Sequence, residues 1–203
     1  MIDLALWVKN RWCGSAICTL LMERKLEEIY SEFYLARCQK KLKEWRAPLD
    51  GWFCREIIDV REDDEEAPLA TCELCDCSKV RFVHVMDHQL YFEEIRVGCI
   101  CAGVMQGDIL VAQERENLMK NRSKRRKNFL KKKWNEVAPM GALHTYRRVY
   151  KGIGILISVY PGDRYLVMGN HSSTDKYKGC LINNFRTAVY AAFDLVDPVE
   201  DIL

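Results

Sequence analysis

Apolar residues recur at three- and four-residue steps in two segments of the chain, and this period predicts amphipathic helices. The first segment spans residues 14–46 and has apolar positions at Ile17, Leu20, Leu21, Leu26, Ile29, Tyr30, Phe33 and Leu42. The second follows Asn184 as a predicted N-cap, ends at Asp197-Pro198, and has apolar positions at Phe185, Ala188, Val189, Ala192, Phe193 and Val196. A third helix is expected from Asp108, as its N-cap, to about Val137.

Alternating apolar and polar residues predict strands elsewhere. "WFCREIIDV" is typical of one short strand, and "KVRFVHVM" and "FEEIRVG" are expected to form a hairpin across "DHQLY". "HTYRRVYK", "GIGILISVY" and "RYLVMGN" are predicted to form a three-stranded sheet, with "PGD" as the turn between the last two strands. Together with the helix that follows, they make a β-β-β-α unit.

Composition points to a folded protein of the cytoplasm. Hydrophobic residues make up 49% of the chain and charged residues 30%, which is ordinary for a soluble globular protein. The apolar runs are shorter than the roughly 20 residues that span a bilayer, so no membrane partner is expected. Lys9 and Arg11 follow the first apolar residues, which is the wrong order for a signal peptide. In a reducing compartment, paired cysteines more often bind metal than form disulfides.

Five of the ten cysteines are closely spaced around the predicted hairpin. Cys72-x-x-Cys75 precedes the hairpin and Cys99-x-Cys101 follows it, which is the chain order of a zinc ribbon or treble clef. Zinc prefers four soft ligands in a tetrahedron, so one structural Zn²⁺ bound by these four cysteines is predicted. Alternative ligands are Cys77, His84 and His88. The lone cysteines, including Cys38 and Cys54, are interpreted as small buried hydrophobes.

His84 and His88 also raise the possibility of a His-Asn-His-type nuclease, with His88 as the general base. The remaining parts of such a site are missing, because no asparagine lies between His88 and Cys99 and no histidine follows Cys101 in the next helix. A hydrogen-bonded or zinc-ligating role is favoured for both histidines. The chain is therefore predicted to have no catalytic activity, and a degenerate nuclease is kept as an alternative.

Positive charge is concentrated between Arg115 and Arg148, where twelve Lys or Arg residues accompany only two acids, while the whole chain has a net charge of +2. This asymmetry favours contact with the phosphates of DNA or RNA. The predicted helical contacts are Lys120, Arg122, Lys124, Arg125, Arg126, Lys127, Lys131, Lys132 and Lys133. The sheet is expected to add Tyr146, Arg147, Arg148 and Tyr150, whose aromatic rings could stack on unpaired bases. The acidic run "REDDEEAP" is interpreted as a solvated linker.

The motifs "VRFVHVMDH", "VGCICAGVMQGD" and "ERENLMKNRSKRRKNFLKKKW" resemble a group of poorly characterised bacterial and phage zinc-ribbon proteins over residues 72–134. The resemblance implies a metal-binding module and no established activity. The C-terminal pattern is similar to the three-strands-plus-helix DNA-binding modules of integrase N-termini, and the double-stranded-RNA-binding fold shares this order.

The sequence thus predicts an α+β fold in four segments. They are an N-terminal helical region with an acidic linker (1–70), a zinc ribbon (71–108), a basic helix (109–142) and a β-β-β-α domain (143–203). The predicted function is that of a non-catalytic, zinc-binding nucleic-acid-binding protein, an accessory or regulatory factor of a bacterial, phage or mobile-element nucleoprotein system. The alternative is an adaptor or inhibitor that docks an acidic protein partner on its basic helix.

Overall fold

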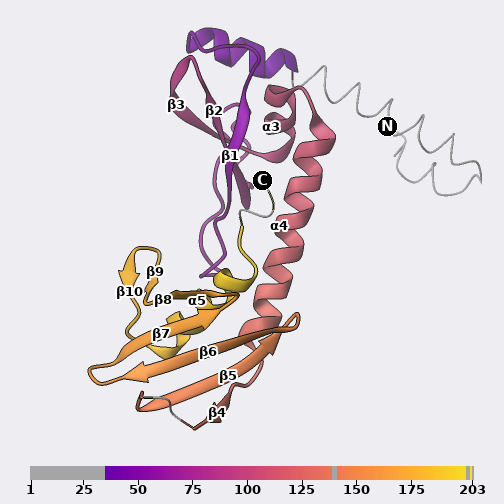
Figure 1. Cartoon of the computed structure of the whole chain (residues 1–203). Coiled ribbons are helices and arrows are strands. Elements are labelled where there is room, and N and C mark those ends of the chain that lie inside the picture. Colours follow the sequence, from indigo (N-terminus) through magenta and orange to yellow (C-terminus); the bar gives the residue numbers. More distant parts are fainter. Residues whose placement is uncertain (1–34, 139–140, 200–201, 203) are drawn as a thin grey trace, which may run out of the picture. The chain divides into compact units, whose positions relative to one another are not determined.

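The computed structural model describes residues 35–138, 141–199 and 202, and it confirms the mixed helix-and-strand class predicted from the sequence. These residues form two units (Figure 1). The first ends at Arg55 and resumes over Leu69–Gln113, and the second contains Glu56–Pro68 and the described residues from Glu114 onward. The division therefore falls within strand β1 (Phe53–Asp59) and within helix α4 (Ile109–Leu130). The predicted helix at residues 14–34 lies outside the described residues, and its continuation over residues 35–44 is helical.

The predicted hairpin is confirmed. Strands β2 (Phe82–His88) and β3 (Tyr91–Val97) pair antiparallel, with Met86 opposite Ile95, in a three-stranded sheet of order β1-β2-β3. All residues from 82 to 86 are buried, so both faces of β2, the central strand of this sheet, are covered. This burial of both faces places His84 inside the first unit rather than on its surface.

The segment after the hairpin, which was predicted to be a knuckle, is a helix. "CICAGVMQ" forms helix α3 (Cys99–Gln106), and Gly107 ends it in the left-handed conformation, with φ of 80°. Asp108 then caps α4 as predicted, because its Oδ1 accepts a hydrogen bond from the Val111 amide at 3.0 Å. The tight α3–α4 turn requires Gly103, since a Cβ there would lie 2.5 Å from the Ile109 Cα.

The basic helix ends seven residues earlier than expected. The predicted end was Val137, whereas α4 ends at Leu130 and residues Asn135–Val137 form strand β4. The rings of Phe129 and Trp134 pack edge to face, with centroids 6.0 Å apart, and a continuing helix could not bring them together across five positions. Tertiary packing of these aromatic rings therefore overrides the helical propensity of the three lysines between them.

The second unit contains the predicted β-β-β-α arrangement within a larger sheet. Strands β4, β5 (His144–Tyr150), β6 (Ile153–Tyr160), β7 (Arg164–Gly169) and β8 (Ser172–Thr174) form a five-stranded antiparallel sheet in chain order. Two short strands, β9 (Lys176–Tyr177) and β10 (Cys180–Leu181), pair with each other before helix α5 (Phe185–Val196). The predicted cap is confirmed, because Asn184 Oδ1 accepts the Thr187 amide at 2.8 Å.

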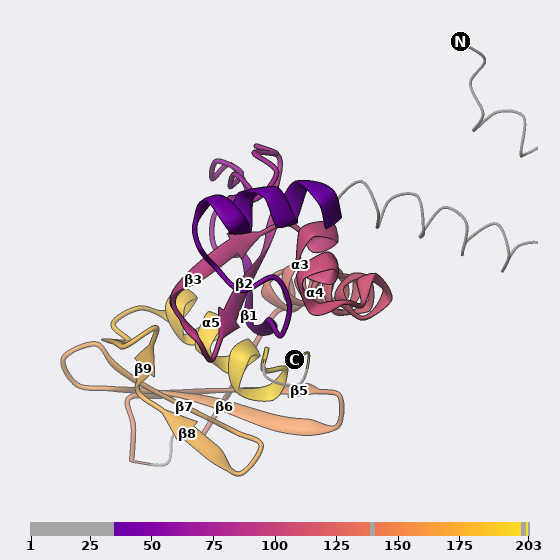
Figure 2. The same ribbon diagram turned by 90° about the horizontal axis from the view of Figure 1, so that it is seen from above.

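Helix α5 covers one face of this sheet (Figure 2). Its buried residues pack on Ile155, Ile157 and Val167 from the sheet, and Phe129 from α4 joins the same core. A Cβ at Gly169 would lie 3.2 Å from the Val196 side chain, which shows how closely the helix approaches β7. Within the described part of the chain, no helix is long and apolar enough to cross a membrane.

Candidate metal centre and basic aromatic pocket

Three of the four predicted zinc ligands lie together in the first unit. The Sγ atoms of Cys72, Cys75 and Cys101 are all within 4.8 Å of one another, so the three thiols could hold a metal ion. Cys72 and Cys75 sit on a tight turn closed by hydrogen bonds from the Asp76 amide to the Cys72 carbonyl and from the Cys72 amide to the Cys77 carbonyl, both 2.9 Å. Cys101 comes from the first turn of α3.

Cys99 does not join this group. It precedes Cys101 by two residues on α3, and two helical residues are separated by about 200° around the axis, so their side chains point to opposite sides. The Cys99 thiol instead lies within 4.8 Å of a ring nitrogen of His84. The predicted ligand set of Cys72, Cys75, Cys99 and Cys101 is therefore wrong in its third member.

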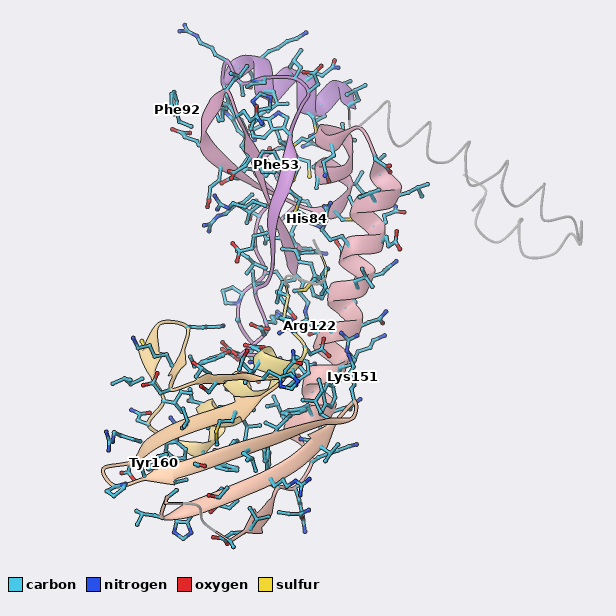
Figure 3. All side chains as sticks on the ribbon, in the orientation of Figure 1. Phe53, His84, Phe92, Arg122, Lys151 and Tyr160 are labelled. Carbon is cyan, nitrogen blue, oxygen red and sulfur yellow. The ribbon has the colours of Figure 1, made fainter. Side chains whose placement is uncertain are left out.

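The predicted alternative ligands are also placed elsewhere. His84, labelled in Figure 3, is fully buried, and its Nδ1 lies 3.9 Å from Cys54 Sγ. His88 stacks at a tilt on Trp52, with ring centroids 5.3 Å apart, and its Nδ1 accepts the Leu90 amide at 3.0 Å. Cys77 is exposed and lies outside the group of three thiols. His88, the residue considered as a general base, is engaged in contacts with Trp52 and with the Leu90 amide of the hairpin turn.

Hydrogen bonds among these cysteines favour the ionised thiolate form of Cys72. A hydrogen bond from Cys101 lowers the pKa of Cys72 to about 5 against the opposing effect of burial, and the amides of Gly98 and Cys75 act in the same direction. Hydrogen bonds with Cys38 and with Cys72, together with burial, raise the pKa of Cys101, which keeps its proton. Amides that point at sulfur are the feature expected of a metal-binding knuckle, because they stabilise the negative charge that a bound cation requires.

Sequence reasoning missed Cys38. This residue lies on the helix at 35–44, is only 2% exposed, and is hydrogen-bonded through its thiol to Cys101. That hydrogen bond lowers the pKa of Cys38 in spite of burial. A lone cysteine separated from Cys72 by more than thirty residues carries no spacing signal, so only the fold could reveal it.

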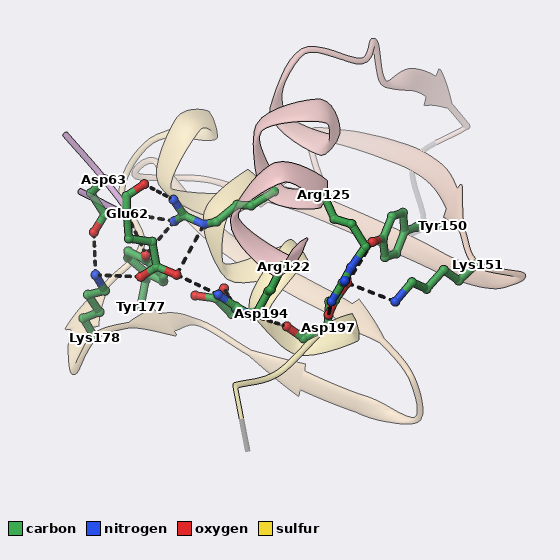
Figure 4. Close-up of polar contacts among 11 residues, drawn as sticks. Glu62, Asp63, Arg122, Arg125, Tyr150, Lys151, Tyr177, Lys178, Asp194 and Asp197 are labelled. Atoms are coloured by element: carbon green, nitrogen blue, oxygen red, sulfur yellow. Dashed lines mark hydrogen bonds and ion pairs between the residues drawn. The ribbon is translucent and has the colours of Figure 1, made fainter. Parts of the chain in front are cut away.

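The arginines of the basic helix are bound to carboxylates of their own unit (Figure 4). Arg122 is 2% exposed, and it donates to Glu62 Oε1 at 2.8 Å, to Asp194 Oδ1 at 2.6 Å and to the Asp197 carbonyl at 2.8 Å. Its guanidinium also lies 5.0 Å from the centroid of the Phe193 ring. Arg122, which was predicted to contact phosphate, is thus buried and paired with carboxylates of its own unit.

Arg125 and Arg126 are engaged in the same way. Arg125 forms a two-pronged pair with Asp197, with both distances 2.7 Å. Arg126 is buried and donates to Asp63 Oδ1 at 2.8 Å and to the Tyr177 hydroxyl at 3.0 Å. The acidic segment that was interpreted as a solvated linker thus neutralises the basic helix within the second unit. Three of the predicted phosphate contacts are therefore occupied by carboxylates.

The residues predicted on the C-terminal sheet divide between its two faces. Tyr146, Arg148 and Tyr150 alternate onto the face that α5 covers, where Tyr150 packs on Phe129 and Arg148 donates to the Phe129 carbonyl at 2.6 Å. Arg147 lies on the opposite face and is exposed. The interpretation of all four as one open surface is wrong, because neighbouring strand residues point to opposite faces.

A pocket of about 590 Å³ opens in the second unit where the end of α4, β5 and α5 meet. Four aromatic residues line it, namely Trp134, Tyr146, Phe185 and Tyr190. Lys132, Lys133 and Arg186 line it as well. These rings pack against one another. Phe185 lies edge to face against Tyr146, with ring centroids 4.8 Å apart, and against Trp134, with centroids 6.1 Å apart. The structure thus brings together the predicted residues Lys132, Lys133 and Tyr146.

Among the aromatic and cationic residues of the pocket, four were not predicted as site residues: Trp134, Phe185, Arg186 and Tyr190. Trp134 directly follows three lysines, and an aromatic residue beside a basic run was the one available signal. The Trp134 Nε1 donor is buried, and no acceptor reaches it within the described ranges. Arg186 extends over Tyr190, with its Nε donating to the Tyr190 hydroxyl at 2.7 Å.

Comparisons with protein-family models, curated proteins and solved structures find no match to this chain. The resemblance to zinc-ribbon proteins therefore stays a prediction. Function is inferred below from the chemistry of the described residues.

Proposed function

We propose that the protein binds single-stranded nucleic acid, without catalysing a reaction on it, and that the pocket of the second unit receives an unpaired base. The observation that carries this proposal is the combination of four aromatic rings with three cationic side chains around one pocket. Every base has a π-face, so aromatic rings bind bases of any sequence, while cations beside them bind the phosphates. The volume of about 590 Å³ lies within the range of roughly 300–1,000 Å³ that is typical of small-ligand sites.

Phosphate contact is assigned to a smaller set of cations than the sequence suggested. Lys124, Lys131, Lys132, Lys133 and Arg147 are exposed, and no described carboxylate forms an ion pair with them. Arg122, Arg125 and Arg126 would have to exchange carboxylates for phosphates, which would leave buried acids unpaired. Lys120 and Lys127 hold weaker exposed pairs with Glu116 and Glu65. Nucleic acid would therefore follow the lysines at the end of α4.

The three clustered thiols of the first unit support the proposal of a structural Zn²⁺. Zinc prefers thiolate ligands, and structural zinc sites stabilise small folds that have limited cores. The cluster is nearly buried, so the ion would have no open position for a substrate. A cytoplasmic location is part of this proposal, because reducing conditions keep such thiols available for metal.

A titration of the purified protein with labelled oligonucleotides tests the proposal. Single strands of about 12 nucleotides should bind more tightly than a duplex of the same sequence, because only unpaired bases can enter an aromatic pocket. Contact through three to five cations predicts that log K falls with log salt with a slope of about −2 to −3.5. Binding of duplex and single strand with equal affinity would exclude the pocket as the recognition site.

An adaptor role is supported by one observation, which lies on the first unit and not on the basic helix that was predicted to dock the partner. Leu90 and Phe92 at the tip of the β2–β3 hairpin are highly exposed (Figure 3 labels Phe92), and exposed apolar side chains that lie close together mark protein-binding surfaces. An adaptor would show no salt-dependent binding to either oligonucleotide. The same titration therefore decides between the two functions.

A further inference from the structure

Cys38 and the three clustered thiols belong to three different elements of the first unit. Cys38 is on the helix at residues 35–44, Cys72 and Cys75 are on the knuckle before β2, and Cys101 is on α3. Cys38, Cys72 and Cys101 are each no more than 2% exposed. Several cysteine thiols that come together from separate elements are the arrangement that a shared tetrahedral metal ion requires.

We infer that Cys38 is the fourth ligand of the metal centre, which is thus formed by Cys38, Cys72, Cys75 and Cys101. The inference rests on the proposed Zn²⁺ and adds the residue that completes a tetrahedral, all-sulfur site. The Cys38 thiol is hydrogen-bonded to Cys101, although it does not lie within 4.8 Å of all three of the other thiols, so ligation would draw it closer to them. Cys99 is excluded by its direction on α3, and Cys77 by its exposed position.

The surroundings of the four thiols suit a Cys₄ site. Four thiolates and Zn²⁺ carry a net charge of −2, and such a site needs hydrogen-bond donors and nearby cations. The amides of Cys75 and Gly98 donate to Cys72, and the amide of Cys77 donates to Cys75.

Ligation by Cys38 gives the metal a specific structural role. Residues 35–44 precede the sheet, and the described hydrogen bonds between this helix and the knuckle include an exposed pair of Lys41 with Asp76 at 2.8 Å. An exposed pair contributes only about 0–1 kcal/mol. The ion would add a covalent connection between the helix and the knuckle to the packing of the fully buried Leu42, and metal loss should loosen the helix at residues 35–44.

Cobalt substitution of the full chain tests the inference. Co²⁺ replaces Zn²⁺ in tetrahedral sites, and the intensity of its thiolate charge-transfer band scales with the number of sulfur ligands. Wild-type protein should show a four-sulfur spectrum. Cys38→Ser should lower the band by about one quarter, the share of one thiolate in four, and weaken Zn²⁺ binding by at least tenfold. The matched control Cys99→Ser should change neither quantity.

The outcomes distinguish a failure of the inference about Cys38 from a failure of the proposed metal centre itself. If wild-type protein binds neither Co²⁺ nor Zn²⁺, the proposed metal centre itself is wrong. If wild type binds the ion, and Cys99→Ser rather than Cys38→Ser lowers the band, Cys38 is not a ligand. Should Cys38→Ser fail to fold, Cys38→His keeps a ligand at this position, and X-ray absorption should then count three sulfurs and one nitrogen. Four sulfurs in Cys38→His would overturn the inference.

Discussion

Arg122 and Asp194 form an ion pair inside the second unit, with Nη2 of the arginine 2.6 Å from Oδ1 of the aspartate. The pair joins α4 to α5, and the remaining nitrogens of the same guanidinium bind Glu62 and the Asp197 carbonyl. One buried arginine thus connects the acidic segment, the basic helix and the C-terminal helix (Figure 4).

Arg122→Gln should lower the free energy of unfolding by about 3–5 kcal/mol, because removal of one partner leaves the buried acids uncompensated. Urea-induced unfolding, followed by circular dichroism, measures this change. The control is Lys124→Gln, an exposed residue two positions away on α4, which should change stability by less than about 0.5 kcal/mol. Equal stability of the two variants would show that Arg122 is solvated rather than buried in this network.

The contacts of Asp197 predict that the protein loses part of its stability as the pH falls. Burial opposes its ionisation, but hydrogen bonds from Arg125, Tyr150 and Lys151 outweigh it and lower the pKa of Asp197 from 3.8 to about 2. A carboxyl with a lowered pKa stabilises the fold above its ordinary pKa, and this contribution is lost as the pH falls from about 4 to 2. The contribution is about 2 kcal/mol at neutral pH.

Asp197→Asn should therefore lose about 2 kcal/mol at pH 7 and show a flatter decline of stability between pH 4 and 2. Denaturation measured at half-unit pH steps provides the test. Asp163→Asn removes a charge from the exposed β6–β7 turn and should keep the wild-type pH profile. The network is misassigned if Asp197→Asn and wild type decline in parallel.

Metal removal should destabilise the first unit. Elemental analysis of purified protein should find about one equivalent of zinc, and a strong chelator should lower the thermal midpoint, because metal-binding energy contributes directly to folding. Cys72→Ser should lose both the metal and the response to chelator. Cys180→Ser, at an exposed position on β10, should keep both. A chelator-treated protein with native thermal stability would contradict the account.

The sequence predicted the features that depend on neighbouring residues. The β2–β3 hairpin, the Asp108 cap and the Asn184 cap follow from local alternation and capping chemistry, and all three are confirmed. The two charged runs were interpreted separately, although each is the other's partner. Their pairing joins Glu62 to Arg122 across 60 positions, and no local pattern encodes such a contact.

The direction in which side chains point explains most of the remaining differences between the sequence predictions and the structure. Cys99 and Cys101 were treated as equivalent because a knuckle was expected, but a helix directs them to opposite sides. Tyr146 and Tyr150 were placed on an open surface, although strand alternation puts them on the side that α5 buries. Which face of an element is buried depends on what packs there, and this information comes from the tertiary fold.

The structural contacts of His88 predict that the protein does not hydrolyse nucleic acid. It receives the Leu90 amide in the hairpin turn and packs on Trp52, so it is engaged structurally. Plasmid DNA and structured RNA should remain intact with the protein in the presence of magnesium or manganese. His88→Ala should lower stability without changing zinc content. Cleavage by wild type that His88→Ala abolishes, at equal zinc content, would establish a nuclease.

The pocket of the second unit is tested most directly by an anisotropy titration of a labelled single strand against matched charge variants. Lys132→Gln combined with Lys133→Gln removes two cations that line the pocket, and Lys120→Gln combined with Lys127→Gln removes two cations of α4 that are paired with carboxylates and do not line it. The account predicts that the pocket variant binds at least about tenfold more weakly and has a salt slope reduced by about 1.4, the share of two phosphate contacts. The control pair should lose clearly less affinity. Equal losses in the two variants, or no binding by wild type, would contradict the assignment of this pocket to nucleic acid.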